Sequence, residues 1–585
     1  MSRILTCILA LILAACSEKP AESNSASVTD QINRIADEFV DGYYAQYPEE
    51  VYEIGYPNSP MDRFGDHSEE STAAWAARVD GWLAELDSIE LDEVEETSTA
   101  LTYVYAREKL QSIVNRRVCH MELWNVSSTW TGWQYMFAST LAVQPVATES
   151  EREDALARLA DISRYLDTEI SNLRRGQDLG YTAGQNNVDA VVGKITALIE
   201  TPVAESPLYS PADRTDDDDF IAAYSETLST AVIDAMTAYR DFLVNEYNGH
   251  TGPGVGANQD GAACYAASVR YHASISMDAE DIHRAGLSEM ARIQSEMLEI
   301  AKESFGTDDI KGLLEELRTN PEYTFNDEQH MLDYVAAAVT RGEAAMDDWF
   351  ANVPDAEMQI IAAPPYDKDS GGGFYSAGTA DGSRPGTYTV GTYNPTTISI
   401  AGTEATAFHE SYPGHHLQMA TALMNDSTHP IFRYTYVSGS GEGWGLYSER
   451  LADEIGLYSS ELDRLGMLSN EAYRAARLVV DPGMHVMGWS RDDAIQYLLE
   501  HTAQGMDSVT GEVDRYSAVP GQATSYLLGS MEIQRLRSVA EEALGDDFDI
   551  REFHDRIIRN GSVTLPMMGA AVESWIRNTQ EQNAQ

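Results

Sequence analysis

The sequence predicts a mainly α-helical protein of two lobes with a small β element. Apolar residues recur at helical spacing along most of the chain, and alternating strand patterns are scarce. One glycine-rich stretch with β-branched and aromatic neighbours interrupts this periodicity. Of the 585 residues 43% are hydrophobic, which is ordinary for a globular protein and excludes a disordered chain.

The first 16 residues are expected to be a lipoprotein signal peptide. Arg3 is followed by an apolar run over 4–13, by Ala14-Ala15 and by Cys16. This resembles a bacterial lipobox, in which the cysteine is lipidated. The alternative is a plain signal peptide with an incidental cysteine, but a polar tether over 17–30 favours the lipobox. Because Ser17 resembles the outer-membrane sorting signal, we expect a lipid anchor at the periplasmic face of the envelope, in the outer membrane.

The charge balance limits the partners. Asp and Glu number 94 against 39 Lys and Arg, a net charge of −55. Nucleic-acid binding requires a basic surface, so it is excluded, and adhesion to anionic lipid is disfavoured. Membrane contact is therefore expected through Cys16 alone. The charge predicts an acidic surface suited to a salty medium, with an acid-lined cleft for cationic substrates as the alternative.

The helical pattern predicts an N-terminal lobe over 31–250 and a catalytic lobe over 263–585, packed as one structural unit. A glycine-rich passage, Asn248–Gly261, separates them. The first helix is expected after an Asp30 cap. The apolar faces that carry the prediction are Ile32, Ile35, Phe39, Val40 and Tyr43; Leu159, Ile162, Leu166, Ile170 and Leu173; and Leu287, Met290, Ile293, Met297 and Ile300.

Two cysteines remain after the signal peptide and the lipidated residue, namely Cys119 and Cys264. In an oxidising compartment they could form a disulfide. Two buried free thiols are the alternative, since the sequence gives no distance between them.

The β element is predicted between residues 360 and 400, where clustered glycines precede Thr387–Tyr393. We expect loops with a short strand or hairpin, beside the motif described next. Such a strand would pair with an extended substrate, with Tyr388 along it, and the alternative is a surface hairpin without a role. Arg384 would pair with a substrate carboxylate or, equally, stabilise a turn.

A metal-binding pattern follows in His409-Glu410-Ser411-Tyr412-Pro413-Gly414-His415-His416. Zinc peptidases hold the ion with two histidines one helical turn apart, and a glutamate beside the first accepts a proton from water. Here the second histidine comes two residues late. In an unbroken helix His409 and His415 would be about 9 Å apart along the axis, so the Pro-Gly pair is expected to bulge out. Expelling two residues favours His415 over His416 as the ligand and leaves His416 in the second shell.

The third ligand is predicted to be Glu442, about 25 residues further on in Gly441-Glu442-Gly443-Trp444-Gly445. Two histidines, one glutamate and an open position form a catalytic zinc site. Glu449 lies seven residues later on the same helical face, where it would hydrogen-bond a ligand from the second shell. Tyr526 is predicted to stabilise an oxyanion. His485 would do the same or be a buried structural imidazole.

These motifs resemble a bacterial family of unknown function, DUF885. The resemblance extends over most of the mature chain, including Asp381–Gly386 and Pro520–Tyr526. That family in turn looks like the helical gluzincin peptidases of the carboxypeptidase Taq, angiotensin-converting enzyme and oligopeptidase types. This second resemblance implies a zincin-like fold with a deep channel between the lobes. The Pro-Gly insertion departs from the peptidase motif.

Together the motifs and the resemblance predict zinc-dependent hydrolysis of short peptides by an anchored lipoprotein. His409, His415 and Glu442 would bind zinc, and Glu410 would be the base. The alternatives are a zinc hydrolase of non-peptide amides or esters, and a non-catalytic metal-containing binding lipoprotein. The oligomeric state stays unknown.

Overall fold

The computed structural model describes residues 27–51, 56–90, 94, 97–363, 373–379, 382 and 384–583. The predicted signal peptide, Cys16, most of the tether, Asp381 and Ser383 lie outside these residues. The protein is mainly helical, as predicted. No helix in the described ranges is long and apolar enough to cross a membrane.

The helices of the N-terminal part begin with α1, which starts earlier than expected. Ser27 caps it by accepting the Asp30 backbone N–H at 3.1 Å, while the Asp30 carboxylate accepts the Ser27 N–H at 3.2 Å. Asp30 is thus the reciprocal partner in a capping box, and residues 28–30 belong to the helix and not to the tether. The helices are α1 (Val28–Gln46), α3 (Glu69–Asp87), α4 (Thr97–Arg116), α5 (Trp133–Val143), α6 (Glu149–Leu179), α7 (Gln185–Glu200), α8 (Ser210–Asp213), α9 (Asp218–Thr227) and α10 (Ile233–Asn245).

The C-terminal part follows the glycine-rich passage. Its elements are α11 (Gly261–Ala273), α12 (Ala279–Ser304), α13 (Ile310–Thr319), α14 (Glu328–Trp349), β1 (Met358–Ala362), β2 (Phe374–Ser376), β3 (Gly386–Val390), α15 (Thr403–Glu410), α16 (His415–Leu423), α17 (Ile431–Tyr434), α18 (Ser438–Ile455), α19 (Glu461–Val486), α20 (Arg491–His501), α21 (Met506–Ala518), α22 (Ser525–Leu544), α23 (Ile550–Ile558) and α24 (Leu565–Asn583).

Most of the predicted apolar faces are buried, because helical spacing places them on one side of each helix. In α6 all five predicted residues are buried. In α12 four are buried, but Leu287 is 45% exposed. The periodicity therefore identified the helices and placed one residue on the wrong side.

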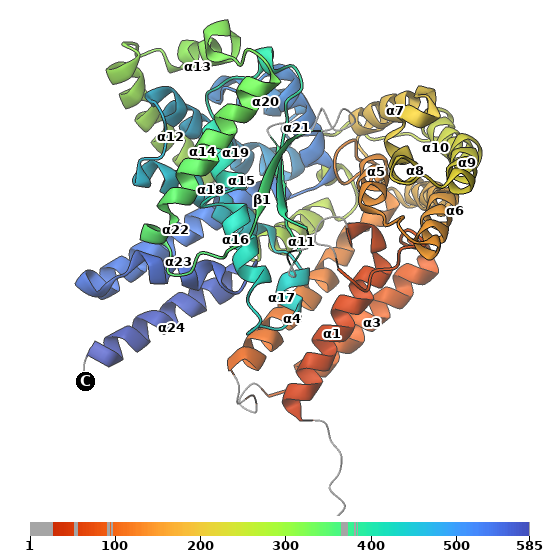
Figure 1. Ribbon diagram of the computed structural model, residues 1–585, viewed down its shortest axis with the longest axis horizontal. Coiled ribbons are helices and arrows are strands. Elements are labelled where there is room, and N and C mark those ends of the chain that lie inside the picture. Colours follow the sequence, from red (N-terminus) through yellow and green to blue (C-terminus); the bar gives the residue numbers. More distant parts are fainter. Residues whose placement is uncertain are drawn as a thin grey trace, which may run out of the picture.

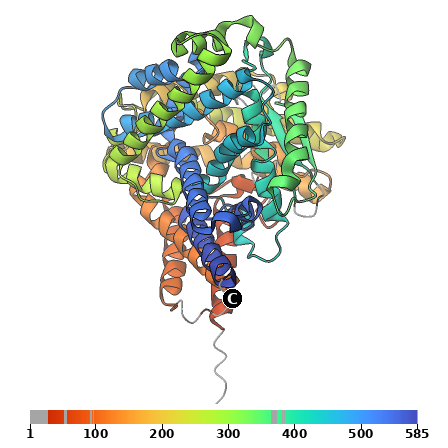
Figure 2. The ribbon, with the colours of Figure 1, turned by 90° about the vertical axis from the view of Figure 1, so that its left-hand side faces the viewer.

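The hydrophobic cores divide the chain differently from the predicted lobes. Helices α5–α10 share one core, at one side of Figure 1. Helices α1, α3 and α4 instead pack in a core with α14, α18 and α22–α24. A third core joins α11–α13 to α19–α22. The first predicted lobe thus contributes its initial helices to the C-terminal part. Helix α1 begins at the end of the molecule where α24 finishes (Figure 2).

A disulfide joins Cys119 to Cys264, so the pairing alternative is the correct one. The bond links residues 145 apart in sequence, one from each predicted lobe, with Cα atoms 4.6 Å apart. It ties the end of α4 to α11.

The predicted β element is a three-stranded sheet in the order β1-β3-β2. Strand β1 pairs with β3 in parallel, and β2 pairs with β3 antiparallel, with Tyr388 opposite both Ile360 and Tyr375. The Tyr375 hydroxyl lies 2.9 Å from His416 Nδ1, which places the sheet against α16. The short strand next to the histidines is therefore confirmed.

Candidate metal centre

The histidine motif spans two helices where a single bulged helix was expected. Helix α15 ends at Glu410 and α16 begins at His415, with a cis Tyr412-Pro413 bond between them. The Trp444 indole donates hydrogen bonds to the carbonyls of Pro413 and Gly414 at 2.9 and 3.3 Å. A Cβ at Gly414 would lie 1.9 Å from the His409 carbonyl oxygen, so this tight return requires glycine.

The break brings the three predicted ligands together. The Nε2 atoms of His409 and His415 lie 3.5 and 3.4 Å from the same oxygen of Glu442. All three candidate ligand atoms lie within 4.8 Å of one another, and both histidines are buried. These two contacts are longer than ordinary hydrogen bonds. The three candidate ligand atoms therefore leave space for an ion between them. The cluster can hold a metal ion.

Helix α18 fixes the orientation of His409. A Cβ at Gly445 would lie 2.6 Å from Cε1 and Nε2 of His409, so glycine lets the ring rest on the helix. One turn further on, Glu449 Oε1 lies 2.9 Å from His409 Nδ1. This carboxylate–histidine contact leaves Nε2 for a metal and places Glu449 in its predicted position. Burial lowers the pKa of His409, but the carboxylates of Glu442 and Glu449 outweigh it and raise that pKa to about 10.

Glu410 lies directly beside the ligands. Its side chain is buried and forms no hydrogen bond or ion pair with the described residues. Burial raises the pKa of its carboxyl above the ordinary value, although the neighbouring His409 opposes this shift. The charge of Glu410 is close enough to Tyr388 to add to the burial that raises the pKa of that phenol. An unpartnered carboxylate at this place is suited to exchange a proton.

Two tyrosines flank Glu442. Burial raises the pKa of Tyr526, and the charge of Glu442 adds to that shift, so the predicted Tyr526 does lie near the ligands. Tyr436 was not predicted. Burial and then the charges of Glu442 and Tyr526 raise its pKa, and its hydroxyl packs where a Cβ at Gly441 would be, only 2.1 Å away. Gly441, the glycine before Glu442, is the sequence signal that could have indicated a side chain packed at this position.

His485 lies in a structural environment, which favours the alternative of a buried structural imidazole. Its Nδ1 accepts the Val255 backbone N–H at 3.0 Å, and its Nε2 lies 3.1 Å from the Tyr516 carbonyl oxygen. The ring stacks on Tyr265 with centroids 5.2 Å apart. Both nitrogens are used by the backbone, so the imidazole fastens the glycine-rich passage to α19 and α21.

His416 also differs from the expectation. Its Nδ1 contacts the Tyr375 hydroxyl, and its Nε2 lies 2.9 Å from the Tyr412 hydroxyl and 3.2 Å from the Ala356 carbonyl oxygen. It therefore contacts no ligand of the cluster and binds the sheet to α16. Burial lowers the pKa of His416 to about 4.

Arg384 stands at the turn that leads into β3. Its backbone N–H donates to Thr379 Oγ1 at 3.0 Å, and its carbonyl accepts the Thr379 N–H at the same distance. Its guanidinium forms no ion pair with the described residues. The backbone of Arg384 thus takes part in the turn, as one of the two predicted roles requires.

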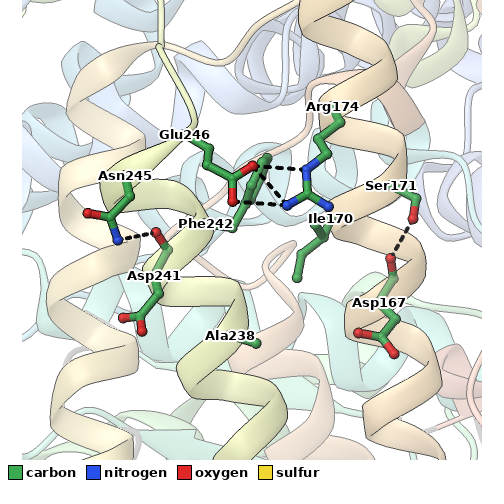
Figure 3. A pocket seen from close by; sticks show the side chains of 9 residues that line it. All are labelled: Asp167, Ile170, Ser171, Arg174, Ala238, Asp241, Phe242, Asn245 and Glu246. Carbon is green, nitrogen blue, oxygen red and sulfur yellow. Dashed lines mark hydrogen bonds and ion pairs between the residues drawn. The ribbon is translucent and has the colours of Figure 1, made fainter.

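Two pockets stand out elsewhere on the molecule. One, of about 460 Å³, lies between α6 and α10, where the Arg174 guanidinium binds the Glu246 carboxylate (Figure 3). The other, of about 320 Å³, lies between α12 and α19 and is lined mainly by acidic residues. Neither includes a residue of the metal cluster, so neither is the candidate site.

Solved structures share this fold. The putative lipoprotein from Colwellia psychrerythraea is 23% identical with a TM-score of 0.88, covering 95% of this chain and 100% of its own. A putative lipoprotein of unknown function from Shewanella oneidensis is 18% identical with a TM-score of 0.71, covering 93% and 99%. No curated protein matches the chain.

The strongest assignment comes from the sequence family. Residues 48–572 match the bacterial proteins of unknown function called DUF885, a stretch that includes every ligand of the cluster. The chain belongs to the DUF885 family.

Proposed function

We propose that the protein is a zinc-dependent hydrolase of peptide bonds in short peptides. The observation that carries the proposal is the cluster of His409, His415 and Glu442 with the unpartnered Glu410 beside it. Two histidines, one carboxylate and an open position are the ligand set of catalytic zinc sites.

The spacing of the ligand atoms supports zinc. A tetrahedral ion with bonds of about 2.0–2.1 Å has ligand atoms about 3.4 Å apart. The two histidine nitrogens lie 3.5 and 3.4 Å from the Glu442 oxygen. The Glu449 contact to His409 is the outer support that such ligands require.

The chain's own residues would divide the reaction as follows. Zinc, when bound, would supply a Lewis acid for the substrate carbonyl and a more acidic water. Glu410 would accept the proton of that water and donate it to the leaving amine. Tyr436 and Tyr526 would donate hydrogen bonds to the oxyanion.

The remaining expectations belong to the same proposal. Tyr388, beside Glu410, and Arg384, at the start of β3, would contact the extended substrate. The zincin-like arrangement with a channel between two lobes stays part of the proposal, as an inference from the resemblance to the helical gluzincin peptidases.

Glu410→Gln tests this function. It keeps size and polarity but removes the base, so turnover of a mixed peptide library should fall by several orders of magnitude while zinc remains stoichiometric. Undiminished turnover would refute the role of Glu410. If the parent hydrolyses only non-peptide amides or esters, the first alternative holds. If it binds zinc and hydrolyses neither class, the binding-lipoprotein alternative holds.

We also propose a lipid anchor on Cys16 at the periplasmic face of the outer membrane. The lipobox supports it, as do the structural neighbours described as putative lipoproteins and the Cys119–Cys264 disulfide, which suits an oxidising compartment. Cys16→Ser should move the protein from the membrane fraction to the soluble fraction. Unchanged fractionation would refute the anchor.

A further inference from the structure

Two cations on α4 lie without an acidic partner in a strongly acidic chain. Lys109 and Arg116 are seven residues apart and share one helical face. The Lys109 ammonium and the Arg116 guanidinium lie 5.6 and 4.3 Å from the centroid of the Tyr271 ring. Neither is within ion-pair distance of a carboxylate in the described residues, although the protein has 94 acidic residues against 39 basic ones.

Hydrogen-bonding capacity at this place is also unused. Arg116 Nε and His272 Nε2 are buried and have no hydrogen-bond partner. His272 is 8% exposed, and burial, with Arg116 and Lys109 beside it, holds its pKa well below the ordinary value. Since buried polar groups are nearly always paired, these atoms indicate an acceptor that the chain does not supply.

One residue, Tyr436, links this group to the metal cluster. The Lys109 ammonium donates to the Tyr436 carbonyl oxygen at 2.8 Å. The hydroxyl end of the same tyrosine packs against Gly441, the residue before Glu442. A single residue therefore connects the cations of α4 to the third metal ligand.

A second group of cations that outnumbers its carboxylate partner lies on α19 and α21. Arg477 and Arg515 share one carboxylate, that of Glu512, at 3.0 and 2.9 Å. The Arg477 guanidinium lies 4.6 Å from the Tyr526 ring centroid. The charge of Arg515 also helps to lower the pKa of His272, as the charges of Arg116 and Lys109 do. Both groups of cations therefore act on His272.

Acidic groups nearby do not cancel the charge. Glu50 acts on Lys109 from a distance and accepts a hydrogen bond from the Tyr43 hydroxyl at 2.5 Å. Glu108 is paired with Arg270 at 2.6 Å. The single carboxylate of Glu50 thus acts against the two positive charges of Lys109 and Arg116.

The two cations of α4 are not fully buried. Lys109, Arg116 and Tyr436 each have intermediate exposure. Burial nevertheless lowers the pKa of Lys109 to about 8. Lys109 is therefore partly exposed and at the same time largely surrounded by protein atoms.

We propose that Lys109, Arg116 and His272 form a subsite for a carboxylate of the substrate, next to the metal cluster. A guanidinium and an ammonium together provide charge-assisted hydrogen bonds to such a group. The proposal rests on the proposed function and specifies its substrate as a peptide with a carboxylate near the cleaved bond. The carboxylate is either the peptide's C-terminus or an acidic side chain.

Three peptide series distinguish these sources. The first has a free C-terminus, the second a C-terminal amide, and the third a C-terminal amide with glutamate as its last residue. Loss of a charge-assisted hydrogen bond lowers kcat/KM by about 10–100-fold. We expect a loss of this size for the plain amide in the parent protein, and rescue by glutamate if side chains are also accepted.

Lys109→Met and Arg116→Gln should lower kcat/KM for the carboxylate peptides and leave the plain amide unchanged. The matched controls are Lys194→Met and Arg577→Gln, which remove exposed cations far along the chain. They should behave as the parent. Equal loss on acid and amide, or a parent that treats them alike, would overturn the subsite.

A binding measurement separates this inference from the function itself. Calorimetry with zinc-loaded Glu410→Gln would compare the tripeptide Ala-Ala-Ala with its amide. Tighter binding of the acid that disappears with Arg116→Gln, without hydrolysis by the parent, would support the subsite and refute the peptidase. Hydrolysis with equal binding of acid and amide would support the peptidase and refute the subsite.

Discussion

A single methyl group at Gly445 should remove the metal while the fold persists. The Cβ of Gly445→Ala would stand 2.6 Å from Nε2 and Cε1 of His409, whereas carbon contacts are ordinarily about 3.5–4.0 Å. The ring would have to withdraw by about 1 Å, which is several times the roughly 0.2 Å that a metal–ligand distance tolerates. The same movement would stretch the 2.9 Å contact with Glu449.

The expected loss of zinc affinity exceeds the roughly 10–100-fold that outer-ligand changes cause, because an inner ligand itself is displaced. Competition with a chromogenic chelator measures it. Gly193→Ala is the matched control, since it lies in the interior of α7 with nothing within 4 Å of the new Cβ. Both substitutions favour the helix by about 1 kcal/mol, so thermal unfolding should show neither variant unfolded. If Gly445→Ala binds zinc as tightly as Gly193→Ala, the close approach of α18 does not position His409.

Three further predictions concern the ligands, the crosslink and a buried ion pair. His415→Ala should lose zinc, because its Nε2 is one of the three candidate ligand atoms. His416→Ala should keep zinc near stoichiometric, because the His416 nitrogens contact tyrosine hydroxyls. Metal analysis that shows the reverse pattern would overturn the ligand assignment. Cys119→Ser should lower the free energy of unfolding by up to about 5 kcal/mol, which is the chain-entropy value for a loop of 145 residues. A denaturant titration that shows no loss of stability would contradict this prediction. Burial lowers the pKa of His67, but the carboxylates of Glu169 and Glu49, 3.2 and 3.6 Å from its ring nitrogens, outweigh burial and raise that pKa to about 10. The contribution of His67 to stability is therefore complete below pH about 6.5 and is lost as the pH rises toward 10. His67→Gln should flatten the fall of the melting temperature over this interval, and an unchanged slope would exclude the pair.

Much of the metal cluster was predictable because histidine is rare in this chain and the histidines and glutamates stand in a specific order. His409, His415 and Glu442 needed only the assumption that the Pro-Gly pair interrupts the helix. The form of the interruption was not predictable. Trp444, some 30 residues further along, holds the carbonyls of the break, and a local rule for proline cannot include that contact.

Helix periodicity also has a defined limit. It identified α1, α6 and α12, because a helix buries residues at regular spacing whatever it packs against. It could not say which helix packs against which. The lobe boundary at the glycine-rich passage was therefore drawn along the sequence, whereas the core places α1, α3 and α4 against helices from the C-terminal part.

That packing also explains why the cations of α4 were missed. Lys109 and Tyr436 are 327 residues apart in sequence, and only the docking of α4 brings them together. A net charge of −55 described the average surface and suggested an acid-lined cleft as the alternative for substrate binding. Charge acts over about 8 Å at physiological ionic strength, and less screening applies to buried groups. Local composition therefore decides what a site attracts, and in the described residues around Tyr271 and Tyr436 an ammonium and a guanidinium have no carboxylate partner.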